Sequence, residues 1–185
     1  MITPPRTLIR REVVNGLIKE QAGEHPTPAG ARAWPAHALP LDWEETYPLI
    51  LVYDTRESVT GEVEGEDERT LEVELECYAA AENVETLEDL LDLLAFAAEQ
   101  AVANNQALYQ WAHSVKYQGT DKTRHHKGRT FYGLAAVRFQ IAYIVRPLDE
   151  GSLDDFLRFH GEYDLAPPDQ VVDATDDINL PAPEE

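Results

Sequence analysis

The sequence predicts an α+β protein, with a mainly antiparallel sheet of four to five strands and two helices packed on one of its faces. Residues 69–79 alternate between apolar and acidic side chains, as a strand exposed on one face does. Residues 86–102 repeat leucine and alanine at helical spacing, and residues 129–146 form a second long apolar alternation. A helix, two strands, a second helix and two more strands in this order favour helices on one face of an antiparallel sheet.

The N-terminal part predicts one helix and two strands. A helix over residues 6–21 begins after two prolines and repeats apolar residues every three to four positions. Residues 21–40 are rich in proline, which predicts an extended segment with a short edge strand at residues 31–34. The apolar run at residues 48–53 predicts a strand that is covered on both faces.

Two polar segments predict loops between the strands. Residues 57–68 are acidic and contain glycine, which predicts a hairpin loop. Residues 119–128 predict a second polar loop, which follows a short strand at residues 115–117. Gly133 predicts a bulge or a bend in the last long strand.

The second predicted helix has recognisable ends. Thr86 and Asp89 have the spacing of a capping box, and acidic residues around them suit the positive end of the helix dipole. Asn104 and Asn105 mark its expected stop.

Composition divides the chain into a core domain, residues 1–148, and an acidic C-terminal arm, residues 149–185. Prolines interrupt the arm, although residues 153–160 could form one or two helical turns. Aromatic side chains are unusual in a solvated linker, so we expect the arm to dock on a surface of its own chain or of a neighbour. The expected anchors are Phe156, Phe159 and Tyr163.

Charge and cysteine content exclude several classes of protein. The formal net charge is −20, and a surface this acidic repels the phosphate backbone of nucleic acids. Cys77 is the only cysteine, so the chain has no internal disulfide, and its place in an apolar alternation predicts a small buried side chain. No signal peptide or membrane-spanning stretch is recognisable, so we expect a cytoplasmic origin and no membrane partner.

Three histidines are the best candidates for metal ligands. His113, His125 and His126 lie close in sequence, and with a carboxylate they would suit a metal-dependent hydrolase. However, basic residues surround His125 and His126, and the spacing of known zinc motifs is absent. No phosphate-binding loop or nucleophile motif is recognisable either. We therefore expect no catalytic residues, no metal and no cofactor, and the hydrolase is an alternative.

The segregation of charge has two interpretations. One alternative is that residues 116–129 form a solvated basic loop; the other is that this loop contacts the acidic hairpin of an identical neighbour. The second contact would be heterologous, and it makes a ring if its rotation closes. The basic candidates are Lys122, Arg124, Lys127 and Arg129, and the acidic candidates are Glu62, Glu64, Glu66, Asp67 and Glu68.

The order and spacing of several segments carry a family resemblance. They are the N-terminal helix, Pro48-Leu-Ile-Leu-Val-Tyr53, Leu71-Glu-Val-Glu-Leu-Glu-Cys-Tyr78, Leu87-Glu-Asp-Leu-Leu-Asp-Leu-Leu94, the closing strand and Phe159-His-Gly-Glu-Tyr-Asp-Leu-Ala-Pro-Pro-Asp169. Together they resemble the tail terminator, or tail-completion, proteins of long-tailed bacteriophages. The resemblance covers roughly residues 5 to 180 and is a pattern of order, without a sharp motif.

The resemblance implies a structural virion protein that is not an enzyme. It implies a small α+β subunit that forms a ring, expected to be a homohexamer, at the junction of tail and neck. The ring would cap the tail tube protein, stop tail polymerisation and present a surface to the head–tail connector protein. DNA would pass through its lumen without specific binding, and assembly would take place in the host cytoplasm. The nearest alternative is another neck or connector protein at the head side.

Overall fold

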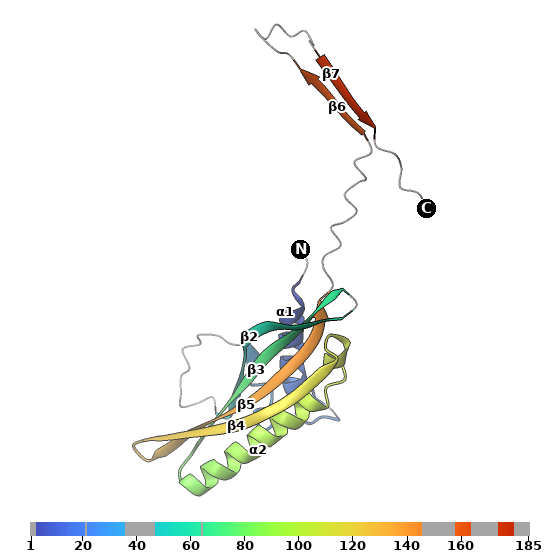
Figure 1. Cartoon of the computed structure of the whole chain (residues 1–185). Helices are drawn as coiled ribbons and strands as arrows, with labels where there is room; N and C mark the ends of the chain where they lie inside the picture. Colours follow the sequence, from blue (N-terminus) through green and yellow to red (C-terminus); the bar gives the residue numbers. More distant parts are fainter. Residues whose placement is uncertain are drawn as a thin grey trace. The chain divides into compact units, whose positions relative to one another are not determined.

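A mixed five-stranded sheet and two helices make up the first of two units, Met1–Val145, in this computed structural model (Figure 1). The second unit is Arg146–Glu185. The structure describes residues 3–20, 22–35, 47–63, 65–145, 158–163 and 174–179, the last two as backbone only. The α+β class that the sequence predicts is therefore confirmed.

The strands lie in the order β1-β2-β3-β5-β4 across the sheet. The short strand β1 runs parallel to β2, and the pairs β2–β3, β3–β5 and β4–β5 are antiparallel. The strands are β1 (Ala33–Pro35), β2 (Leu49–Val63), β3 (Glu66–Ala81), β4 (Ser114–Lys127) and β5 (Thr130–Val145). The edge strand expected near residues 31–34 is β1, and it covers only the first residues of β2.

Helices α1 (Pro5–Ile18) and α2 (Val84–Ala103) share one buried cluster with the inward side chains of the strands. On β3 this cluster takes every second residue from Leu71 to Ala79, which confirms the predicted alternation. Buried leucines of α2 supply the helix side of this cluster, and the burial of each such side chain stabilises the fold by about 1.5–3 kcal/mol. A short 3-10 helix, Leu108–Gln110, follows α2. None of the described helices is long and apolar enough to span a membrane.

Both polar segments that were predicted as loops are strands. β2 extends to Val63 and β3 begins at Glu66, so the acidic segment is a long hairpin that turns at Gly65, where φ is +81°. β4 runs from Ser114 to Lys127 through the whole predicted second loop. The predicted hairpin is present, but the length of its loop and the whole second loop were wrong. Ladder hydrogen bonds hold the backbone of these strands, and their exposed side chains need no apolar alternation.

Two details of α2 and β5 also differ from expectation. The N-cap of α2 is Asn83, whose side-chain oxygen accepts a hydrogen bond of 2.8 Å from the Thr86 backbone N–H, so Thr86 is not the cap. Gly133 lies in unbroken register with β3 and β4 and makes no bulge. A Cβ at Gly133 would lie 2.5 Å from Leu91 Cδ1, so glycine here permits the close approach of α2 to the sheet.

The second unit contains one described hairpin. β6 (Arg158–Tyr163) pairs antiparallel with β7 (Ala174–Asn179). The predicted helical turn is therefore wrong over residues 158–160, whose backbone pairs with β7; residues 153–157 lie outside the described residues.

Candidate assembly surfaces

The β2–β3 hairpin forms an acidic end of the sheet. Asp67 pairs with Val145 at the last position of the β3–β5 ladder, and the pair of Val63 with Glu66 is the one described position of the hairpin beyond it. Part of the acidic charge is already engaged, because Asp67 accepts a hydrogen bond of 2.9 Å from Arg69, and Glu68 lies 3.1 Å from His113 Nε2. Glu62 is exposed, Glu66 is half-buried, and Glu64 lies outside the described residues.

The predicted basic candidates lie on β4 and in its turn to β5. Lys122 forms ion pairs with Asp92 and, at 3.3 Å, with Glu88 of α2. Arg124 pairs with Glu88 at 3.0 Å. The charges of Lys122 and Arg124 therefore hold β4 to α2 in the same subunit, which the sequence prediction of an intersubunit role missed.

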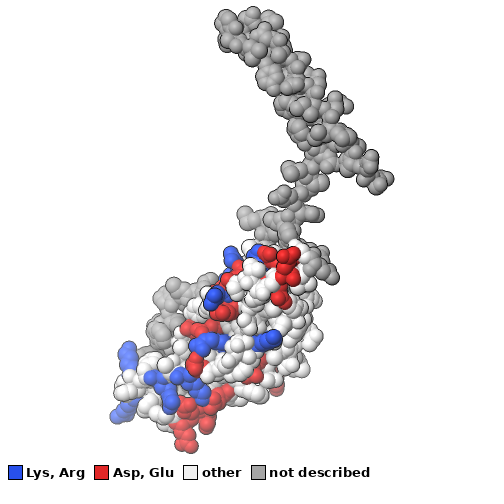
Figure 2. All heavy atoms as spheres, viewed as in Figure 1, with Lys and Arg blue, Asp and Glu red and all other residues white. Residues whose placement is uncertain are grey.

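Lys127 and Arg129 are the basic residues that remain available at this end. Both side chains are exposed, and neither forms an ion pair within the part of the chain that the structure describes. Figure 2 shows Lys and Arg atoms over the β4–β5 end of the sheet with Asp and Glu atoms beside them at the lower end of α2, and further Asp and Glu atoms over the β2–β3 end.

The strand register places the acidic and basic ends far apart. Val145 marks the acidic end of β5 and Phe131, which pairs with His126, marks the basic end. The strand between them is about 45 Å long at the usual rise per residue. The two hairpins of one subunit therefore cannot contact each other, whereas those of two subunits can.

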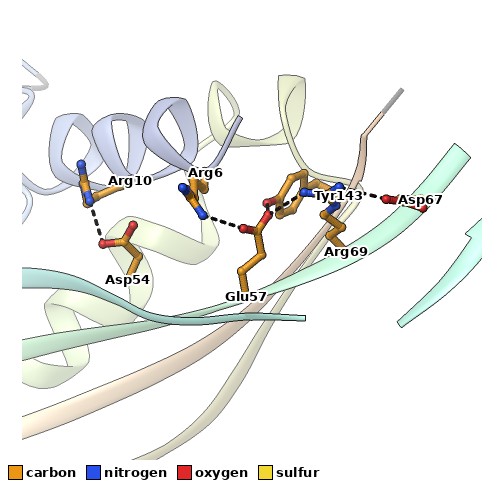
Figure 3. Close-up of polar contacts among 7 residues, drawn as sticks. All are labelled: Arg6, Arg10, Asp54, Glu57, Asp67, Arg69 and Tyr143. Atoms are coloured by element: carbon orange, nitrogen blue, oxygen red, sulfur yellow. Dashed lines mark hydrogen bonds and ion pairs between the residues drawn. The ribbon is translucent and has the colours of Figure 1, made fainter. Parts of the chain in front are cut away.

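A separate group of charges joins α1 to the sheet (Figure 3). Arg10 donates a hydrogen bond of 2.7 Å to Asp54, and Arg6, one helical turn earlier, donates one of 2.9 Å to Glu57. The buried Tyr143 hydroxyl also donates to Glu57. This group was not predicted from the sequence, where its only signal is the i, i+4 spacing of the two arginines, which puts both on one helix face.

The pKa of Glu57 is held below its ordinary value. The largest cause is the hydrogen bond from Tyr143, burial acts in the opposite direction, and Arg6 and Arg69 lower the pKa further. Arg69 Nη1 lies 3.4 Å from Glu57. Because every charge of this group has a partner within the subunit, we assign it to the stability of the fold.

The face of the sheet away from the core is largely polar towards its acidic end. Arg138 of β5 donates hydrogen bonds of 2.7 Å to Glu74 and 2.5 Å to Asp121. A shallow hollow of about 360 Å³ lies beside these groups, and its lining includes Thr55, Glu72 and Gln140. It is too open and too polar to resemble a small-molecule site.

The histidines do not converge. His113 lies against Glu68, whereas the His125 ring stacks on Tyr132 with centroids 5.4 Å apart and His126 lies beside Phe131. No group of three or more His, Cys, Asp or Glu side chains could hold a metal ion among the residues that the structure describes.

Cys77 and the three aromatic residues of the arm are the remaining residues that the sequence singled out. Cys77 is buried, as predicted, and burial raises the pKa of its thiol to about 12. Phe159 and Tyr163 lie in β6, where only the backbone is described, and Phe156 lies outside the described residues.

In comparisons with known proteins, no family model matches the chain, and no curated protein matches it.

Proposed function

We propose that this protein is a ring-forming tail terminator subunit of a long-tailed phage, which acts by assembly and not by catalysis. The support is the order of its helices and strands, which resembles that family, together with the two oppositely charged ends of its sheet. In this proposal a homohexameric ring caps the tail tube protein, stops its polymerisation and offers its other side to the head–tail connector protein in the virion.

The observation that carries the proposal is the separation of charge along one sheet. Lys127 and Arg129 at one end have no acidic partner among the described residues, and Glu62 is exposed at the other end. Contacts between opposite ends join unlike surfaces of successive copies, and such heterologous contacts form a ring when the rotation between copies closes. An acidic lumen would let DNA pass without adhesion.

The C-terminal segment has a proposed role of its own. Residues 149–185 act as an arm that docks on the assembled ring, with Phe156, Phe159 and Tyr163 as its anchors. The basis is their occurrence in an otherwise acidic, proline-containing sequence.

Imaging of purified particles tests the function. Sixfold rings at the end of the tail tube would support it, whereas absence of the protein from purified tails would contradict it. A position on the head side of the neck would identify a connector protein instead.

Charge reversal tests the contact. Lys127→Glu with Arg129→Glu should weaken assembly more at low than at high salt, because exposed charge contacts are screened. The matched control is Arg11→Glu with Lys19→Glu, which changes the net charge equally at two exposed residues, one within α1 and one at its C-terminal end. Equal effects of the two double variants on sedimentation at low salt would remove the basic end from the contact.

A further inference from the structure

The sheet has two open edges. β4 pairs only with β5 among the described strands, so its other edge has no partner there. β1 covers β2 only from Ile50 to Val52, and no described strand pairs with that edge beyond Val52. Open edges leave backbone N–H and C=O groups free to pair with another strand.

On both open edge strands, β2 and β4, pairing with the neighbouring strand is free of register shifts over only part of the strand. On β4 the register shifts between Tyr117 and Gly119 and is unbroken from Gly119 to Lys127. On β2 shifts flank the regular stretch Arg56–Val59. Bulges twist an edge away from a partner, so these two stretches are the parts of the edges that can accept a strand.

We propose that β4 of one copy, at Gly119–Lys127, adds as a strand to the open stretch Arg56–Val59 of β2 in a second copy. This inference rests on the proposed ring and specifies the contact that forms it. β2 and β4 run in opposite directions within one sheet, because three antiparallel pairings separate them. Sheets of successive copies in the same orientation therefore continue as an antiparallel ladder.

Charge selects this occupant over a symmetric β4–β4 contact. Lys122 and Arg124 are paired with α2, but two β4 strands would also bring the exposed Lys127 of each copy onto the same basic strand of the other, and like charges opposite each other destabilise a sheet. Next to the β2 stretch lies the acidic hairpin with Glu62 and Glu66. The Val59 side chain, 62% exposed, also offers apolar surface to a partner.

Disulfide trapping tests the contact in the full-length protein. Ser58 pairs with Thr70 on β3, and Thr123 pairs with Leu134, which pairs with Tyr78 on β3. Thr70 and Tyr78 are an even number of residues apart, so Ser58 and Thr123 point to the same face of the sheet. Paired strands bring Cα atoms within the range that a disulfide requires.

The experiment mixes Ser58→Cys protein with Thr123→Cys protein under mild oxidation. Asp121→Cys and His125→Cys replace Thr123→Cys in parallel mixtures, to cover the neighbouring registers on the same face. Gln100→Cys on α2 is the matched control. Cys77 is fully buried and does not compete.

One of the three mixtures should give cross-linked dimer at least about tenfold above the control, because a held contact raises the effective concentration of the two thiols. Dimer from Thr123→Cys protein alone at the same yield would overturn the proposal in favour of the symmetric contact. No dimer above the control in any register would overturn it as well. Sixfold rings on tails without these cross-links would leave the proposed function standing and reject only this contact.

Discussion

At the scale of single residues, the partners of each charge decide what that charge can do. The net charge of −20 alone suggests a uniformly repulsive surface. However, Asp54 and Glu57 neutralise Arg10 and Arg6, and Lys122 is held by α2. The charged residues that remain for intermolecular contacts are fewer than the composition indicates, and Lys127, Arg129 and Glu62 among them lie at the ends of the sheet.

The hydrogen bond from Tyr143 to Glu57 predicts a stability difference that depends on pH. Tyr143→Phe should lower the free energy of unfolding by about 1–2 kcal/mol at pH 7, because the Glu57 carboxylate loses a buried donor. The folded pKa of Glu57 is lowered, so this stabilisation is complete above the ordinary value of 4.5. It is lost as the pH falls through the folded pKa.

Urea unfolding of the parent and variant at pH 7 and in acid measures this difference. Tyr117→Phe is the control, since the Tyr117 side chain is exposed and, among the described residues, its hydroxyl bonds only to the Thr120 hydroxyl at 2.9 Å. A Tyr143→Phe deficit that stays constant into acid would show that lost packing, not the carboxylate, causes it.

At the scale of helices and strands, predictability follows from burial. α1, β3, α2 and β5 each place apolar residues on one side at the period of their structure, so the sequence reveals them. β4 is a polar edge strand, and its pattern does not distinguish it from a loop. Lys122 and Arg124 were accordingly predicted as intersubunit residues, because only the strand geometry turns them towards α2.

The N-terminus of α2 distinguishes the predicted cap from the observed one. Asn83→Ala should destabilise the protein by about 1 kcal/mol, because the Thr86 backbone N–H loses its acceptor. Thr86→Ala keeps that hydrogen bond and should change stability by less than about 0.5 kcal/mol. Thermal unfolding of both variants shows which residue caps the helix, and a larger loss of stability for Thr86→Ala would support the capping box that the sequence suggested.

Gly133 controls how closely α2 packs on the sheet. Gly133→Ala should cost about 1–3 kcal/mol, since the added methyl overlaps Leu91 in a close-packed core. In a Leu91→Ala background the same change should cost less, because the obstructing atoms are gone. Urea unfolding of the parent, the two single variants and the double variant measures the interaction energy between positions 133 and 91. Additive effects would mean that the backbone of β5, and not contact with α2, requires the glycine.

At the scale of the whole molecule, the arrangement of strands gives the sheet one acidic end and one basic end. The acidic and basic segments are 50 to 70 residues apart in the chain, and composition alone cannot say whether they meet. The register of β3, β4 and β5 puts them at opposite ends of one sheet. Their separation favours contacts between copies, which is the physical requirement of a ring.

The division of the chain into two units predicts that the first unit folds without the C-terminal arm. A chain of residues 1–148 should unfold in a single cooperative transition, because the buried cluster described here draws on side chains from Ile9 to Tyr143. The same chain should dock poorly on rings or tails, since the proposed anchors Phe156, Phe159 and Tyr163 are removed. Calorimetry and co-sedimentation with full-length protein measure the two effects separately. Loss of cooperative unfolding would show instead that the arm completes the core of its own subunit, and normal docking of a folded 1–148 chain would remove the arm from assembly.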